Sequence, residues 1–120
     1  MNDRTLLELA ARAAGYQFSY SYRSLSSPAV PVILAETGRW RQWDPRHDDG
    51  DALRLAVTRG LVVTPDRENQ RTLVSNQAGH EYCAIYWDKL GEMAATRLAI
   101  TEAAAEIGKS MTQPGATSSP

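Results

Sequence analysis

Several side chains that can bind cations or exchange protons lie close together in the middle of the sequence; they are Asp44, His47, Asp48, Asp49 and Asp51. Carboxylates in a loop that leads into a helix are the oxygen ligands that a hard cation such as Ca²⁺ prefers. The calcium-loop pattern is nevertheless broken, because Pro45 and His47 stand where acidic residues should precede Gly50. Carboxylates at a helix start also satisfy its free amide groups and its dipole without any metal. We therefore expect helix capping here, with a metal site or a partner-facing acidic patch as the alternatives.

A second group of possible ligands is the short stretch His80, Glu81 and Cys83. A zinc site usually needs four ligands, and His47 could join this group only through the fold. Cys83 lies among apolar residues, which is typical of a buried, unreactive thiol, and a chain with two histidines offers few bases to activate it. The sequence also lacks glycine-rich phosphate loops and common hydrolase motifs. We expect no catalytic residue, no metal and no cofactor; a metal-dependent hydrolase built on Asp48, Asp49 and His47 is the least favoured alternative.

The third group joins aromatic and basic side chains. Trp40 stands between two arginines, and Trp43 follows three residues later. An exposed tryptophan beside arginines is typical of a binding surface, and such side chains can also stack on unpaired bases. In a strand Trp40 and Trp43 would point to opposite faces, because side chains alternate, and we expect Trp43 in the core. The predicted binding surface consists of Trp40, Arg39, Arg41, Asp48 and Asp49.

The strands that would position these residues fall into two regions. Over residues 16–23 aromatic side chains alternate with polar ones, which is typical of a half-buried strand. Two short strands are then predicted around a turn at Thr37-Gly38; they cover residues 32–36 and 39–43. Three further segments rich in branched and aromatic residues predict an antiparallel meander; they cover residues 61–65, 71–76 and 81–87. The sequence leaves open whether the first region pairs with the meander.

Three helices are predicted to pack on these strands. The first covers residues 3–15, is capped by Asp3 and ends at Gly15. The second begins at the acidic cluster and ends at Gly60; its predicted apolar face consists of Ala52, Leu53, Ala56 and Val57. The third runs from a cap at Asp88 to about Lys109; its predicted apolar stripe consists of Met93, Ile100, Ala103, Ala104 and Ile107.

Leu98 points away from the apolar stripe of the third helix, by the 100° step between helical residues. A single exposed leucine is common on protein surfaces. The alternative is a helix that packs on two sides and helps to form a homodimer.

The composition fits one domain with its own core, because 42% of the 120 residues are hydrophobic. The 13 basic and 14 acidic side chains give a net charge of −1, so no overall basic field would hold nucleic acid. The single cysteine cannot form an internal disulfide, which favours a reducing cytoplasm. No apolar run approaches the ~18 residues of a membrane helix, and the N-terminus lacks a secretory signal. We expect a sandwich-like α+β domain over residues 1–109 and a disordered tail over 110–120.

One part of the sequence resembles known families. Trp43-Asp44-Pro45, followed after a polar stretch by a helix segment over residues 51–56, resembles small proteins encoded by tailed phages and prophages, the NinX-like and phage α-β-α sandwich families. The alanine-rich last helix is similar to the ends of such proteins. The likeness covers residues 40–109, whereas residues 16–39 depart from it. It implies a phage-derived origin and an α+β fold, and these families bring no established catalytic residues to transfer.

Together these features favour a non-catalytic phage or prophage accessory protein that binds a host or phage macromolecule, with a protein as the expected partner. The alternative is a small-molecule or nucleotide binder that uses tyrosine and arginine side chains near a sheet edge. Neither nucleic acid nor a membrane is expected as a partner.

Overall fold

A computed structural model describes residues 2–21 and 28–111 of the chain. In chain order its elements are α1 (Asp3–Ala13), β1 (Phe18–Ser21), β2 (Val30–Leu34), β3 (Trp40–Gln42), α2 (Asp49–Arg59), β4 (Val62–Asp66), β5 (Arg71–Ser75), β6 (Glu81–Tyr86) and α3 (Glu92–Met111). The predicted α+β class is confirmed. The end of the strand predicted over residues 16–23 lies outside the described residues. The predicted tail begins two residues too early, because Ser110 and Met111 belong to α3, and its remaining positions 112–120 lie outside the described residues.

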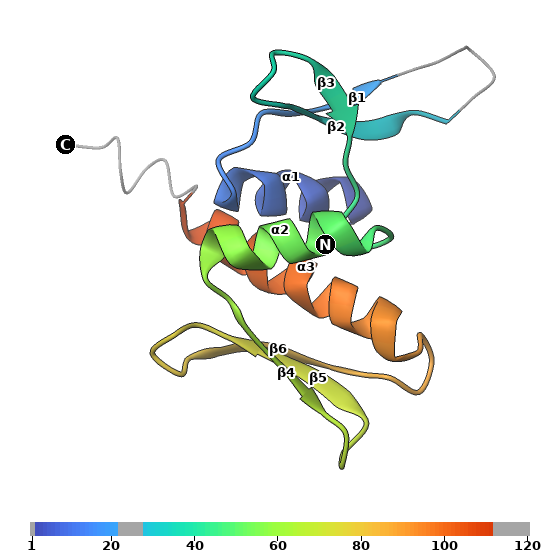
Figure 1. Ribbon diagram of the computed structural model, residues 1–120, viewed down its shortest axis with the longest axis vertical. Helices are drawn as coiled ribbons and strands as arrows, with labels where there is room; N and C mark the ends of the chain where they lie inside the picture. Colours follow the sequence, from blue (N-terminus) through green and yellow to red (C-terminus); the bar gives the residue numbers. More distant parts are fainter. Residues whose placement is uncertain (1, 22–27, 112–120) are drawn as a thin grey trace.

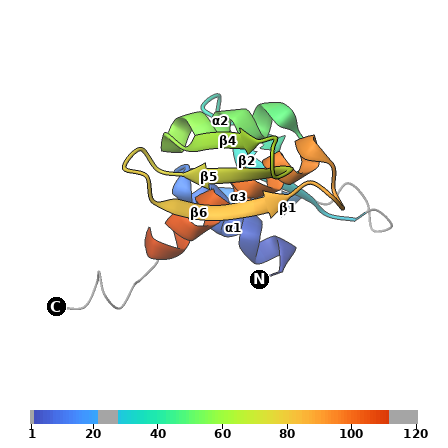
Figure 2. The ribbon, with the colours of Figure 1, turned by 90° about the horizontal axis from the view of Figure 1, so that it is seen from below.

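The strands form two antiparallel sheets (Figure 1). The first sheet has the order β1-β2-β3 and the second has the order β4-β5-β6. The meander predicted over residues 61–87 is therefore confirmed, and the earlier strands pair with one another instead of with it. The three helices lie between the two sheets, with the first sheet at the top of Figure 1 and the second at the bottom. Figure 2 shows the second sheet in front of the helices. The molecule is a layered sandwich whose middle layer is helical.

Aromatic side chains join the first sheet to the core between the layers. Trp43 directly follows β3, is 1% exposed, and meets the rings of Tyr16 and Phe18 edge-on at centroid distances of 5.7 and 6.1 Å. In β1, Phe18 and Tyr20 are half-buried while the serines between and after them are exposed. The predicted alternation in β1 and the predicted burial of Trp43 are both confirmed.

Helix α2 has the predicted ends but buries a different face. Asp48 is its N-cap, and Gly60 ends it in the left-handed conformation with a φ of 62°. The predicted apolar face is wrong in two positions, because Leu53 and Val57 are 62% and 72% exposed while Leu55 is fully buried. Helix α2 contacts α3 and is joined to β3 by the hydrogen bond from Arg41 to Asp51. This orientation turns Leu55 toward the core and leaves Leu53 and Val57 exposed.

Helix α3 lies at the centre of the molecule and contacts α1, α2 and the second sheet. Its buried residues therefore occur all around the helix; they are Ala95, Ala99, Ile100, Thr101, Ala103, Ala104, Ala105 and Gly108. Gly108 approaches α1 so closely that an added Cβ would overlap the carbonyl oxygen of Leu9. Two predictions for this helix are wrong, since it begins at Glu92 after a turn and not at a cap on Asp88, and Met93 is 57% exposed.

The other side of α3 is covered by the chain itself. Leu98 is half-buried, and neighbours within the same chain account for the two-sided packing of its helix. Two-sided packing of α3 was the reason to expect a homodimer, and contacts within one chain explain that packing. A homodimer through α3 stays a prediction. In the described part of the chain, no helix is long and apolar enough to cross a membrane.

The start of α1 differs slightly from its prediction. Asn2 and not Asp3 is the N-cap, and its side-chain oxygen accepts a hydrogen bond from the Thr5 amide at 2.8 Å. The helix ends at Ala13, and Gly15 follows with a left-handed φ of 79°, which agrees with its predicted role. The chain then turns directly into the aromatic segment that leads to β1.

Candidate functional site

A groove of about 900 Å³ lies between the end of α1, the β2–β3 hairpin and α2. We call it the Trp40 groove; the side chains used in the argument below are Tyr16, Leu34, Arg39, Trp40, Arg41 and Arg54. Trp40 is 49% exposed on β3, an edge strand of the first sheet, and its register partner on β2 is Leu34. The predicted exposure of Trp40 is confirmed, and its role in binding stays a prediction.

The β2–β3 turn directly precedes the basic and aromatic residues that line the groove. Gly38 adopts a left-handed φ of 85°, which glycine reaches without strain. The Ala35 amide donates a hydrogen bond to the Arg39 carbonyl at 2.9 Å and closes the hairpin. Arg39 and Trp40 therefore directly follow a tight turn, as the predicted turn at Thr37-Gly38 requires.

One buried carboxylate holds two of the arginines of the groove. The Asp51 side chain is 6% exposed, and its Oδ1 accepts hydrogen bonds from Arg41 Nη1 at 3.2 Å and from Arg54 Nη2 at 2.9 Å. Its Oδ2 accepts the backbone amide of Asp44 at 3.0 Å. The side chains of Arg41 and Arg54 remain 40% and 55% exposed. One carboxylate balances only one of these two charges, so the pair presents positive charge and free N–H donors to the groove.

The third arginine of the groove, Arg39, is exposed at the β2–β3 turn. Within residues 2–21 and 28–111 it has no ion-pair partner. Glu36 is the one carboxylate among the residues that line the groove. The groove therefore combines an exposed indole ring with an excess of guanidinium groups.

An acidic depression of about 700 Å³ adjoins the Trp40 groove, and the two share Arg41 and Arg54. Its acidic side is the loop before α2, which is organised by Asp44. The Asp44 carboxylate accepts hydrogen bonds from the Arg46 amide at 3.1 Å and from Arg46 Nε at 3.2 Å, and it lies 2.8 Å from His47 Nδ1. Burial alone would raise the pKa of Asp44, but the hydrogen bonds from His47 and Arg46 and the charge of Arg46 hold it below its usual value.

The predicted binding residues do not all meet. Trp40 and both flanking arginines line the groove, whereas Asp48 caps α2 and lies in the acidic depression. Asp49 lines neither; its carboxylate pairs with Arg97 of α3 at 2.7 Å. Asp49 therefore connects two helices, and its assignment to the binding surface has no support from its position.

Arg54 was not predicted as a site residue, and the buried Asp51 that holds it was predicted only as a carboxylate of the acidic helix start. Their spacing of three along a helix is a usual signal for a side-chain pair. That signal was hidden because Asp51 also belongs to the acidic run at the helix start, where capping explains a carboxylate equally well. The contact between Asp51 and Arg41 crosses from α2 to β3, ten positions away, and no local pattern reports it.

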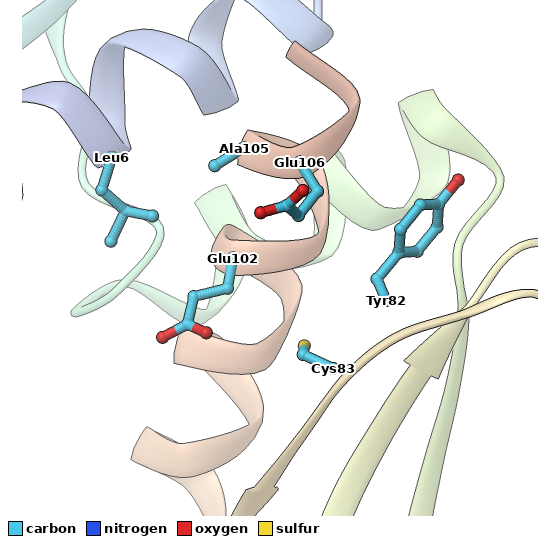
Figure 3. A pocket seen from close by; sticks show the side chains of 6 residues that line it. All are labelled: Leu6, Tyr82, Cys83, Glu102, Ala105 and Glu106. Atoms are coloured by element: carbon cyan, nitrogen blue, oxygen red, sulfur yellow. The ribbon is translucent and has the colours of Figure 1, made fainter. Parts of the chain in front are cut away.

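A smaller pocket of about 330 Å³ lies between α1, β6 and α3 (Figure 3). It is lined by Leu6, Tyr82, Cys83, Glu102, Ala105 and Glu106. A β-bulge brings Tyr82 here, because Val74 pairs with Cys83 and Ser75 pairs with Glu81, which leaves Tyr82 as the extra residue. Of the second group of possible ligands, Cys83 lines this pocket, whereas His80 and Glu81 do not.

The thiol in this pocket is not activated. Cys83 Sγ donates a hydrogen bond to the Ala99 carbonyl at 3.2 Å. Burial and the carboxylates of Glu102, Glu81 and Glu106 raise the pKa of Cys83 to about 12. A thiol with that pKa is protonated at neutral pH and is a poor nucleophile. His80 packs edge-on against the Tyr82 ring, with a centroid distance of 5.1 Å. In the described residues, no group of three or more His, Cys, Asp and Glu side chains could hold a metal ion.

Comparison with protein-family models, curated proteins and solved structures gave no match to this chain. Its function must therefore be argued from the chemistry of the Trp40 groove and not from its fold, since a fold alone does not fix a function.

Proposed function

We propose that this protein is a non-catalytic binding protein and that its Trp40 groove engages a segment of a protein partner. The observation that carries the proposal is the half-exposed Trp40 ring in the lining of a groove that also contains three arginine side chains. Tryptophan and arginine are the side chains that dominate the energetics of protein interfaces. Covering an exposed indole ring with a partner lowers the free energy of the complex, because apolar area is removed from water.

A protein fits this surface better than a nucleic acid does. The depression directly beside the groove adds the carboxylates of Asp44 and Asp48 to the shared arginines, which disfavours a continuous phosphate backbone, and the net charge of −1 gives no general attraction. A small molecule or nucleotide is the second candidate, because the groove volume suits a ligand and Tyr16 and Trp40 offer aromatic surfaces. Against that candidate, the chain has no glycine-rich phosphate loop.

The proposed setting is the cytoplasm of a bacterium that carries the phage or prophage. The phage origin rests on the resemblance around Trp43-Asp44-Pro45 and the last helix. The cytoplasmic location rests on the single cysteine, which forms no internal disulfide. No catalytic step is assigned, in keeping with the protonated thiol of Cys83.

The experiment is affinity capture from bacterial lysate with the tagged protein. Trp40→Ala removes the exposed ring, and Arg59→Ala removes an exposed arginine at the far end of α2, which lines neither depression. We expect the wild type and Arg59→Ala to retain the same protein, and Trp40→Ala to lose it. Capture of the same protein by folded Trp40→Ala would contradict the proposal.

A further inference from the structure

We propose that the segment bound in the Trp40 groove is acidic, with a carboxylate side chain next to an aromatic or large aliphatic one. This inference rests on the proposed function and names the chemistry of its partner. It commits to a peptide segment as the occupant because the charge of the groove and the exposed ring beside it are complementary to such a segment.

The carboxylate would be recognised by a guanidinium pair that is already in position. Arg41 and Arg54 both contact the same Oδ1 of buried Asp51, so a protein carboxylate fixes their heads before any partner arrives. Guanidinium groups carry five N–H donors each, and their contacts with Asp51 and with the Gln42 carbonyl use only part of this set. Fixed donors lose little conformational entropy on binding, and charge-assisted hydrogen bonds to a carboxylate are the stronger kind.

The apolar side chain would cover Trp40. The ring is 49% exposed and shares one face of the first sheet with its register partner Leu34, while Arg41, the next residue of this edge strand, lies on the opposite face. Leu34 and Tyr16 are further residues with apolar surface in the lining of the groove. Arg39 precedes Trp40 in sequence, also lines the groove, and supplies a further cation there. An aromatic or aliphatic side chain beside one or two carboxylates therefore meets complementary groups along the groove.

The adjoining acidic depression separates this proposal from phosphate binding. Asp44 and Asp48 line the depression that shares Arg41 and Arg54 with the groove, so a polyanion that extended past these arginines would meet two carboxylates. A peptide can place a neutral or basic residue there, whereas a polyanion cannot. The observations therefore favour an acidic peptide over a nucleic acid.

The test is an NMR titration of the ¹⁵N-labelled full chain with three acetylated and amidated pentapeptides. The first is Gly-Phe-Glu-Glu-Gly, the second has both glutamates replaced by glutamine, and the third has phenylalanine replaced by alanine. Inorganic phosphate and a thymidine hexanucleotide are titrated in parallel. The readouts are the indole N–H signal of Trp40 and the side-chain Nε–H signals of the arginines.

We expect the Phe-Glu-Glu peptide to shift the Trp40 and Arg54 signals, and to bind about fivefold or more tightly than the glutamine peptide. Arg54→Lys keeps the charge but loses the fork geometry. It should weaken the binding of the glutamate peptide and leave the binding of the glutamine peptide unchanged. Arg59→Ala should bind as the wild type does.

Equal binding of the glutamate and glutamine peptides at Trp40 would overturn the acidic preference and leave the groove as a binding site. Tighter binding of phosphate or of the oligonucleotide at the same signals would overturn it in favour of a phosphate ligand. The absence of any shift with all three peptides would overturn it as well, and the capture experiment with Trp40→Ala would then decide separately on the proposed function.

Discussion

Trp40 and Trp43 carry the same side chain three residues apart, yet one is 49% exposed in a groove and the other is 1% exposed in the core. Trp43→Ala should cost ~3–5 kcal/mol, the usual range for a large core truncation, because it removes the ring that contacts Tyr16 and Phe18. Trp40→Ala should change the free energy of unfolding by less than about 1 kcal/mol, as surface substitutions usually do. Urea denaturation of both variants measures these losses of stability. A larger loss for Trp40→Ala than for Trp43→Ala would show that Trp40, and not Trp43, is the buried ring.

A second prediction concerns the half-buried Glu102 in the pocket of Figure 3. Burial and the charge of Glu106 raise the pKa of Glu102, so the folded protein holds this proton more tightly than the unfolded chain does. Ionisation at neutral pH therefore destabilises the fold, and Glu102→Gln should be more stable than the wild type at pH 7. The difference should shrink below the ordinary glutamate pKa of about 4.3, where the carboxyl is protonated in both states.

The control for Glu102→Gln is Glu68→Gln, which changes an exposed glutamate in the β4–β5 turn. It should melt as the wild type does at both pH values. A lower melting temperature for Glu102→Gln at pH 7 would show that the ionised carboxylate stabilises the pocket.

The residues of the site were predictable to the extent that their signals are local. Trp40 and its flanking arginines are adjacent in sequence, and an exposed tryptophan between charged residues is a clear pattern. The pairing of Asp51 with Arg54 and Arg41 was not predicted, because Arg41 lies in another element. Asp49 was predicted in the surface as part of the acidic helix start, and its ion pair with Arg97, 48 positions away, has no local signal in the sequence.

At the scale of elements, α1 and α3 cross at close range, with Gly108 of α3 against Leu9 of α1. Gly108→Ala would normally favour a helix by ~1 kcal/mol, but here the added Cβ would overlap the Leu9 carbonyl oxygen. We expect a net loss of ~1–3 kcal/mol, as overpacked cores usually show. Ser110→Ala, at an exposed position of the same helix, should stay within about 0.5 kcal/mol of the wild type. Equal melting curves for the two variants would contradict this close helix crossing.

Element types and the meander followed from periodicity, but the faces of the helices did not. On α2 the apolar positions include Leu53, Leu55 and Val57, and the pattern alone does not say which side meets the core. The hydrogen bond between Asp51 and Arg41 of β3 and the contact of α2 with α3 determine which face of α2 is buried. On α3, burial on all sides removes the one-sided pattern from which a stripe could be predicted.

At the scale of the whole molecule, the two sheets are attached differently. Helix α3 contacts α1, α2 and all three strands of the second sheet, whereas the first sheet meets the helices mainly through β1 and the aromatic cluster around Trp43. We expect amide hydrogens of β2 and β3 to exchange faster than those of β5 and α3, because the first sheet can open without unfolding the rest. Native-state hydrogen exchange measures this. Equal protection in both sheets would show that the molecule opens as one cooperative unit.

The existence of two separate sheets follows from long-range packing and not from any segment. The sequence contains six strand-forming stretches, and only pairing in space divides them into two groups of three. The helical middle layer separates those groups, as Figure 1 shows. The Trp40 groove forms where the first sheet, α1 and α2 meet, so no single element could have revealed it.

The most direct test of the central claim, that the Trp40 groove holds a protein partner, is site-specific photo-crosslinking in bacterial cells. A photoreactive phenylalanine analogue replaces Glu36, which lines the groove, and in a second strain it replaces Glu68, which is exposed in the distant β4–β5 turn. We predict one protein adduct from position 36 that disappears when Trp40→Ala is added, and none of that mass from position 68. The same adduct from both positions, or an adduct at position 36 that persists with Trp40→Ala, would contradict the claim.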